Sequence, residues 1–570
     1  VEDGAIHRRR APGKLASLAS KLRTDPIRGT VGIGHTRWAT HGRASECNAH
    51  PHQCGRVAVV HNGVIENQRI LRASLKDRGA VFTSETDTEV VAHLCAEALE
   101  NGAAPLEAVR STLAQLRGAF SLAFLFADQS DRIICARRGS PLAIGVGEDA
   151  HFIGSDAIAL APETNRIVYL EEGDVAVVTR AALEVHDAGG TPAGRAVKLV
   201  DAAYADTGKN GYRHYMAKEM AEQPEVAARA AIAGRRTGLR SRRCPENVAW
   251  ETAERLTIIG CGTAYYAGLL ARSWFDGVAR LPVEVDVASE YRYRRPAMPT
   301  HGVTIFVSQS GETADTLAAM RYAKSEGQTT IALVNVETST MAREADVVAP
   351  IHAGPEIGVA STKAFTAQLI ALASVAISAA LARHRINREE GARMRSSLCG
   401  LSRDFREALA RESLIAPIAA ELAEAPDVIF LGRGAMYPLA LEAALKLKEL
   451  TYVPAQGYAT GELKHGPIAL VEPRRPAVAF APHDALFEKT LSGLHEVSAR
   501  GGRVVLVTDE AGARTAGDTV WRTIEMPTVD PLVAPMVYAV AAQMIAYHAA
   551  LATGKDVDQP RNLAKSVTVE

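Results

Sequence analysis

The chain has 570 residues, and its 64 Lys and Arg against 65 Asp and Glu give a formal net charge of −1 at pH 7. This length predicts roughly three to five domains. The balanced charge excludes a general attraction to nucleic acid or to an anionic membrane. The 7 cysteines form no C-x-x-C pair, and His50 and His52 have no third metal ligand nearby, so we expect no metal site. Scattered free thiols favour a reducing cytoplasm.

Residues 1–205 carry strand and hairpin patterns, and we expect an α+β domain. Val1–Arg10 is charged and has no apolar run behind it, so no signal peptide is predicted. The expected strands cover residues 56–61, 119–126, 132–136, 167–170 and 174–178, and the expected helices cover residues 87–101 and 105–116.

Residues 206–253 are polar and basic, and we interpret them as a linker that can hold helices. Its arginines between Arg235 and Arg243 are predicted to form a solvated face rather than a nucleic-acid surface.

From residue 254 onward the sequence repeats itself. The strand that ends at Gly260 has a counterpart ending at Gly432, an offset of 172 residues. Each copy alternates short apolar runs with helical patterns, which predicts two doubly wound α/β domains with parallel sheets, at 254–390 and 391–558. The apolar stretch 369–382 is shorter than the roughly 20 residues that span a bilayer, so a buried helix is expected.

Three loops of the first copy combine Ser, Thr or Gly with a following helix: Cys261–Ala264, Ser308–Thr313 and Ala360–Lys363. Hydroxyls and the free N–H groups of a helix start make an anion cradle. Any one of them is more typical of an ordinary helix N-cap. Three together favour a phosphate ester as ligand.

The second copy lacks these hydroxyls but carries ionisable groups. Glu442, Lys446 and Glu449 share a helix and could be ordinary surface ion pairs. His465 lies in a loop, where it can move a proton near neutral pH. The tail 559–570 could be a frayed terminus, but it alternates apolar and polar residues as if it lay in a groove. A buried Lys565 could attack a carbonyl as an amine.

The N-terminal domain has its own candidate residues. Arg37 lies beside Trp38, and a guanidinium suits a carboxylate. Asn62 and Gly63 form either a tight hairpin turn or an oxyanion hole. Asp87 either caps a helix or meets an ammonium group.

Taken in order, these motifs resemble the glutamine:fructose-6-phosphate amidotransferase family, also called glucosamine-6-phosphate synthase, from about Gly29 onward. The matching segments are residues 35–42, 61–63, 84–89, 308–313 and 360–363, Glu449, and residues 462–466 and 562–570. The resemblance implies an N-terminal-nucleophile glutaminase domain (an αββα sandwich, here incomplete) and two sugar isomerase domains. It also implies a cofactor-free cytoplasmic homodimer that turns fructose 6-phosphate and glutamine into glucosamine 6-phosphate and glutamate.

The resemblance also implies a role for each candidate residue. Arg37 and Asp87 would hold glutamine, Asn62 and Gly63 the oxyanion, and Trp38 would gate an internal ammonia path. The phosphate-binding residues would be Ser308, Gln309, Ser310 and Thr313, with Thr263, Val359 and Ser361 nearby. The catalytic residues would be His465 (ring opening, from the neighbouring subunit), Lys565 (Schiff base at C2), Glu449 (proton transfer between C2 and C1) and Lys446.

Two departures from the family pattern stand out. Ala264 replaces the usual serine, and the loss of one neutral hydrogen bond should cost about 1 kcal/mol. The family's glutaminase begins with a cysteine whose α-amine activates its thiol, whereas this chain begins with Val1. We therefore expect the chain as it stands not to hydrolyse glutamine.

Two alternatives remain open. A sugar-phosphate-binding regulator would keep the cradle but would not need Glu449, His465 and Lys565 together. An ammonia-dependent sugar-phosphate isomerase or deaminase would lack Arg37, Asn62 and Asp87.

Overall fold

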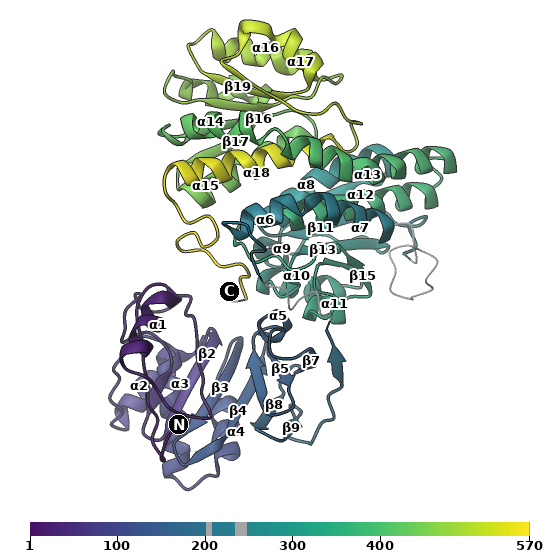
Figure 1. The fold of residues 1–570 in the computed structure, drawn as a ribbon. Helices are drawn as coiled ribbons and strands as arrows, with labels where there is room; N and C mark the ends of the chain where they lie inside the picture. Colours follow the sequence, from purple (N-terminus) through teal and green to yellow (C-terminus); the bar gives the residue numbers. More distant parts are fainter. Residues whose placement is uncertain (201–207, 234–247, 569–570) are drawn as a thin grey trace. The chain divides into compact units, whose positions relative to one another are not determined.

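The computed structural model describes residues 1–200, 208–233 and 248–568, and it divides into two compact units (Figure 1). The first unit comprises Val1–Asp206 with Val567–Glu570, and the second comprises Thr207–Ser566.

The first unit is built on two antiparallel sheets. The larger has the order β1-β2-β3-β4-β8-β9 and the smaller β10-β7-β5-β6. The strands of the larger sheet, in that order, are His52–Cys54, Val57–Gly63, Phe120–Phe126, Gln129–Arg138, Val175–Thr179 and Leu183–His186. Those of the smaller are Val197–Leu199, Arg166–Tyr169, Ala143–Val146 and His151–Gly154. The helices are α1 Leu15–Thr24, α2 Gln68–Asp77, α3 Thr88–Glu100, α4 Pro105–Gln115 and α5 Ala157–Leu160.

Each strand and helix expected in this half corresponds to an element of the structure. β3 is buried at every position, which explains its unbroken apolar run Phe120–Phe126. Residues of α3 and α4 share one hydrophobic core with β2 and β3. The α+β interpretation of the first unit is therefore sound.

The hairpin-turn interpretation of Asn62 and Gly63 is wrong. Both residues end β2, where Gly63 pairs with Phe120, and the ladder continues past them because the N–H of Val64 donates to the carbonyl of Ala119 (2.9 Å). Gly63 has a φ of +135°, and a Cβ there would meet the Ala119 oxygen at 2.1 Å. Glycine is thus required by the close approach of two strands.

The second unit contains two five-stranded parallel sheets of identical topology. Their orders are β12-β11-β13-β14-β15 and β17-β16-β18-β19-β20. The first has strands Val283–Val287, Arg255–Gly260, Gly302–Ser308, Thr329–Val334 and Val347–Pro350. The second has Ala455–Ala459, Val428–Gly432, Ala477–Phe480, Val504–Thr508 and Arg522–Glu525. The internal repeat is confirmed, because the 172-residue offset carries β11 onto β16.

Helices cover these sheets (Figure 1). Those before and within the first repeat are α6 Tyr215–Ala221, α7 Gln223–Ala233, α8 Thr263–Trp274 with the π-helical turn Phe275–Ala279, α9 Ala288–Arg294, α10 Ala314–Ser325, α11 Thr340–Glu344 and α12 Lys363–Ala382. The rest are α13 Arg388–Leu409, α14 Glu412–Ala423, α15 Met436–Thr451, α16 Phe487–Ser498, α17 Glu510–Ala516 and α18 Ala534–Ala552. Short 3₁₀ segments are η4 Thr460–His465, η5 Pro467–Leu470 and η6 Gly517–Thr519.

One hydrophobic core runs through both repeats, and α8 packs against α15 and α12 within it. In the described part of the chain, α12 and α18 are long and apolar enough to span a membrane, but 78% and 89% of their most apolar windows are buried inside the fold. The expectation of a buried helix at 369–382 is therefore confirmed, with its start at Lys363. The predicted linker carries α6 and α7, while its arginines at 235–243 lie outside the described residues.

Candidate active site

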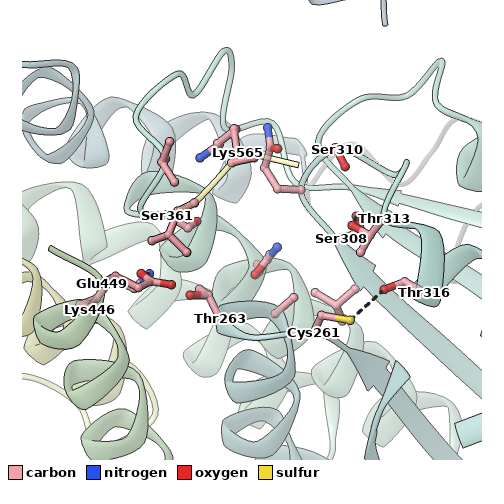
Figure 2. A pocket seen from close by; sticks show the side chains of 17 residues that line it. Cys261, Thr263, Ser308, Ser310, Thr313, Thr316, Ser361, Lys446, Glu449 and Lys565 are labelled. Carbon is pink, nitrogen blue, oxygen red and sulfur yellow. Dashed lines mark hydrogen bonds and ion pairs between the residues drawn. The ribbon is translucent and has the colours of Figure 1, made fainter. Parts of the chain in front are cut away.

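A cavity in the second unit is lined by both repeats and by the tail (Figure 2). The lining residues are Cys261, Thr263, Ala264, Val307, Ser308, Gln309, Ser310, Thr313, Thr316, Val359, Ser361, Gln368, Lys446, Glu449, Leu563, Ala564 and Lys565. All seven residues proposed for the phosphate are among them, as are three of the four catalytic candidates. The cavity lies at the carboxyl ends of the parallel strands, where doubly wound sheets bind ligands.

Hydroxyl groups form one wall of this cavity. Ser308 ends β13, and its Oγ lies 3.0 Å from Thr313 Oγ1 and accepts from the N–H of Gly311 (3.0 Å). Ser310 Oγ accepts from the N–H of Glu312 (3.1 Å). A Cβ on Gly311 would meet Ser339 Oγ at 2.1 Å, so only glycine allows this tight turn before α10. The wall presents hydroxyls and a helix N-terminus, as an anion site requires.

An ionisable cluster on α15 forms the opposite wall. Figure 2 shows Lys446 and Glu449 across the cavity from Ser308 and Thr313. Lys446 Nζ lies 2.6 Å from Glu449 Oε2 and 3.6 Å from Glu442 Oε1, with side-chain exposures of 2%, 21% and 3%. The alternative of ordinary surface ion pairs is wrong, because the side chains of Glu442 and Lys446 are buried and that of Glu449 is only partly exposed.

The charges within this cluster are unequal. Burial raises the pKa of Glu442 to about 7, since it disfavours the carboxylate. Burial alone would lower the pKa of Lys446, but the carboxylates of Glu449 and Glu442 outweigh it and raise that pKa. Lys446 is therefore held as a cation, and its shortest ion-pair contact is to Glu449.

Glu442 also links the two walls. The hydroxyl of Thr263, at the start of α8, donates to Glu442 Oε1 (3.1 Å). The first repeat thus contacts the charged helix of the second repeat by a direct hydrogen bond.

The tail closes the site. Lys565 forms an ion pair with Glu356, and its side chain is 23% exposed. Ser566 Oγ lies 3.0 Å from Ser310 Oγ. The frayed-terminus alternative is therefore wrong for residues 563–566, which line the cavity or bond to its wall.

Glu356 is a site residue that the sequence interpretation missed. It lies just before the loop Ala360–Lys363, and its Oε1 accepts from the N–H groups of Thr362 (2.9 Å) and Ala364 (3.0 Å). It thereby caps α12, and its Oε2 holds Lys565 and the Ser361 hydroxyl (3.2 Å). Burial would raise its pKa, but the Lys565 ammonium and the hydrogen bonds lower it. A lone glutamate before a hydroxyl-rich loop was the available signal.

Within this chain, His465 does not line the cavity. It ends η4, is exposed and is absent from the lining residues. The neighbouring Lys464 pairs with Glu496 on α16 (2.7 Å).

The candidate glutamine residues lie in the first unit. The guanidinium of Arg37 donates to the carbonyls of His41 and Gly42, the latter at 2.9 Å. Trp38 is 44% exposed. The Asn62 amide donates to Thr568 Oγ1 of the same unit (3.1 Å).

Asp87 is not a helix cap in the usual sense. It precedes α3 but makes no side-chain capping bond, and its Oδ2 accepts from the N–H of Ile65 (2.9 Å). The capping interpretation of Asp87 is therefore wrong. Its buried carboxylate orders the segment that follows β2.

Comparison with known proteins gives the family. The glutamine amidotransferase domain family matches residues 35–162, and the SIS domain family matches residues 251–378 and 421–553. The chain is 52% identical over 571 residues to a glutamine–fructose-6-phosphate aminotransferase [isomerizing] of Zymomonas mobilis subsp. mobilis, covering 100% of this chain and 94% of the relative. The chain belongs to this family.

Two further matches agree with this assignment. A relative of the same description from Bradyrhizobium diazoefficiens is 52% identical over 574 residues, with 100% of this chain and 94% of the relative covered. The solved C-terminal domain of glucosamine-fructose-6-phosphate aminotransferase from Francisella tularensis is 39% identical, has a TM-score of 0.58, and covers 62% of this chain and 100% of its own. The resemblance inferred from the motifs, including two SIS repeats and an amidotransferase domain, is confirmed.

Proposed function

We propose that the enzyme to which this chain belongs converts fructose 6-phosphate and glutamine into glucosamine 6-phosphate and glutamate. The observation that carries the proposal is a single cavity with a hydroxyl wall, the buried Lys446–Glu449 pair and Lys565. A binding module would have no reason to bury charged groups beside its ligand, because burying charge costs stability. The family relationship supports the same reaction.

The hydroxyl wall would hold the phosphate. Ser308, Ser310 and Thr313 would donate hydroxyls, and the free N–H groups at the start of α10 would add the helix field. The other proposed phosphate contacts are Thr263, Gln309, Val359 and Ser361.

The chemistry would occur at C1 and C2 of the open-chain sugar. Lys565, as a neutral amine, would attack the C2 carbonyl and form a Schiff base with loss of water. Glu449 would move a proton between C1 and C2, and the ammonium of Lys446, 2.6 Å away, would hold its carboxyl group in place. Before that proton transfer, ammonia from glutamine would attack the C2 imine and displace Lys565 as a free amine, so that moving the proton from C1 to C2 yields the 2-amino aldehyde.

The glutamine half would lie in the first unit. Arg37 and Asp87 would bind the carboxylate and amine of glutamine, Asn62 and Gly63 would stabilise the oxyanion, and Trp38 would gate ammonia. We propose that the two antiparallel sheets belong to an N-terminal-nucleophile αββα sandwich.

The proposed organisation follows from these roles. The glutaminase-type domain would span 1–205, the linker 206–253, the isomerase domains 254–390 and 391–558, and the catalytic tail 559–570. An exposed His465 would open the sugar ring in the site of a second subunit, which makes the enzyme at least a homodimer. We place it in the cytoplasm.

Interconversion of fructose 6-phosphate and glucose 6-phosphate, measured without glutamine, tests the proposal. We expect conversion by the chain and a large loss in Glu449→Gln. Tight sugar-phosphate binding without any conversion would instead support a regulator. If a form of the enzyme that carries the family's N-terminal cysteine aminates the sugar with ammonium but not with glutamine, the ammonia-dependent alternative is supported.

A further inference from the structure

A buried carboxylate contacts the segment Glu356–Gly358, which we call the Glu356 loop. This carboxylate has no role in the reaction described above. Glu219 on α6 is 2% exposed, and its Oε1 accepts from the N–H groups of Ile357 (2.5 Å) and Gly358 (3.0 Å). These are the two residues that follow Glu356. Glu219 therefore fixes the backbone that presents Glu356 to Lys565.

Its other oxygen is buried and has no hydrogen-bond partner in the described part of the chain. A Cβ at Gly358 would lie 2.8 Å from this Oε2, so glycine permits the close approach. Two backbone hydrogen bonds would be met equally well by the oxygen of a glutamine. A carboxylate at this position therefore calls for an electrostatic explanation, because burying an unpaired charge is costly.

Most charged groups near Glu219 have partners of their own, which leaves Glu356 and Lys565 as the charges that act on it. Lys218, on the same helix as Glu219, donates to the Gly208 carbonyl (2.7 Å). Glu222, which follows this helix, forms an ion pair with Lys363 of α12 (2.5 Å). Asp558, from the segment after α18, accepts from the N–H groups that start α6. From the loop and the tail, the charges that act on Glu219 are those of Glu356 and Lys565.

Burial and the negative charge of Glu356 raise the pKa of Glu219 to about 7, while Lys565 opposes the rise. Near neutral pH this carboxyl is thus balanced between its two forms. When it ionises, the carboxylates of Glu219 and Glu356 both lie within electrostatic reach of the Lys565 ammonium.

We propose that Glu219 is a positioning residue that holds the backbone of the Glu356 loop and places a second acidic side chain behind the Glu356–Lys565 ion pair. This rests on the proposed role of Lys565 as the residue that forms the Schiff base. Glu219 itself does not touch the sugar. It acts through Glu356 and the backbone of Ile357 and Gly358.

Reductive trapping of Lys565 tests the proposal. The full chain is incubated with fructose 6-phosphate and cyanoborohydride between pH 6 and 9, and the modified peptide is quantified by mass spectrometry. Glu219→Gln keeps an oxygen for both backbone hydrogen bonds but removes the charge. Glu219→Ala removes both. Glu225→Gln on α7 is the control, since its side chain is 59% exposed and it lies 4.0 Å from Arg406.

We expect the pH midpoint of trapping to be lower in Glu219→Gln than in the wild type, because an acidic side chain near Lys565 is lost. The KM of Glu219→Gln for fructose 6-phosphate should stay within about twofold of the wild-type value. Glu219→Ala should give at least about tenfold less trapped Lys565 adduct, because the Glu356 loop loses both hydrogen bonds. Glu225→Gln should match the wild type in both respects.

An unshifted midpoint in Glu219→Gln overturns the proposal, whatever happens to the amount trapped, because a purely structural residue would change only the amount. A shift of equal size in Glu225→Gln overturns it as well. If the wild type forms no adduct at Lys565 at any pH, the proposed function itself fails and this inference fails with it.

Discussion

The two repeats of the second unit share one strand order but use the same helix positions in opposite ways. At the 172-residue offset, Glu442 and Lys446 of α15 correspond to Leu270 and Trp274 of α8. Leu270 and Trp274 are buried apolar side chains in the common core. In the first repeat, apolar side chains at these positions stabilise the fold. In the second repeat, buried charged side chains occupy them and lower the free energy of unfolding.

The loops differ in the reverse direction. At the end of β13 and just beyond it, the first repeat has the hydroxyls of Ser308 and Ser310, whereas the loop after β18 in the second repeat begins with Ala481 and Pro482. Each repeat keeps one half of the site and gives up the other. A duplicated fold can assign substrate binding to one copy and catalysis to the other, because the helices of both copies pack in one hydrophobic core.

The largest effect is expected at the tail, which neither repeat supplies. With ammonium as the nitrogen source, Lys565→Ala should abolish formation of glucosamine 6-phosphate, since the Schiff base cannot form. Lys555→Ala, at a lysine that lies over the Tyr452 ring, is the control and should retain activity. Normal amination by the Lys565 variant would remove the tail from the reaction.

Next is the charged helix of the second repeat. Glu449→Gln should lower kcat for isomerisation by about 10³-fold, the range of a lost general base, while KM changes little. The exposed neighbour Lys448→Gln should leave both parameters unchanged. An equal fall in both variants would mean that α15 is structural.

The buried Glu442 should make stability depend on pH. Its folded pKa of about 7 lies above its ordinary value of 4.5, so its stabilising contribution is present below 4.5 and is lost as pH rises to about 7. Between those values the wild type should lose on the order of 3 kcal/mol through this group. Glu442→Gln should show a smaller fall in the free energy of unfolding between pH 5 and pH 7.5, measured with denaturant. An unchanged fall would contradict the raised pKa.

The cradle of the first repeat should affect binding more than turnover. Ser310→Ala should raise KM for fructose 6-phosphate roughly 10- to 100-fold, which corresponds to the loss of one hydrogen bond to a charged group, and kcat should change less than about threefold. His483→Ala in the corresponding loop of the second repeat should change neither. A larger effect at His483 would reverse the assignment of the two loops.

The smallest effect is expected where the cradle lacks a hydroxyl. Ala264→Ser should lower KM for fructose 6-phosphate by about two- to fivefold, since a neutral hydrogen bond contributes up to about 1 kcal/mol. A rise in KM would show that Ala264 packs against the ligand or its loop. Initial-rate kinetics on the purified variant are sufficient.

Much of this arrangement could be predicted locally. Gly260 and Gly432 end strands in repeats of one topology, and the loop Ser308–Thr313 lies at a strand end as its pattern indicated. Hydrophobic period and helix-start chemistry are properties of neighbouring residues, so sequence alone carries them. The prediction of a turn at Asn62-Gly63 was wrong, because pairing with the neighbouring strand β3 determines the backbone conformation of these two residues.

By itself, the sequence determined the two parallel-sheet repeats, the hydroxyl loops and the family, since these depend on short-range patterns and on the order of motifs. Only the tertiary structure decided that the ion pairs of α15 are buried, that Glu356 holds Lys565, and that Glu219 stands behind that loop. Burial and charge pairing depend on groups distant in the chain: Glu356 and Lys565 are separated by 209 positions. No local pattern encodes a contact of that kind.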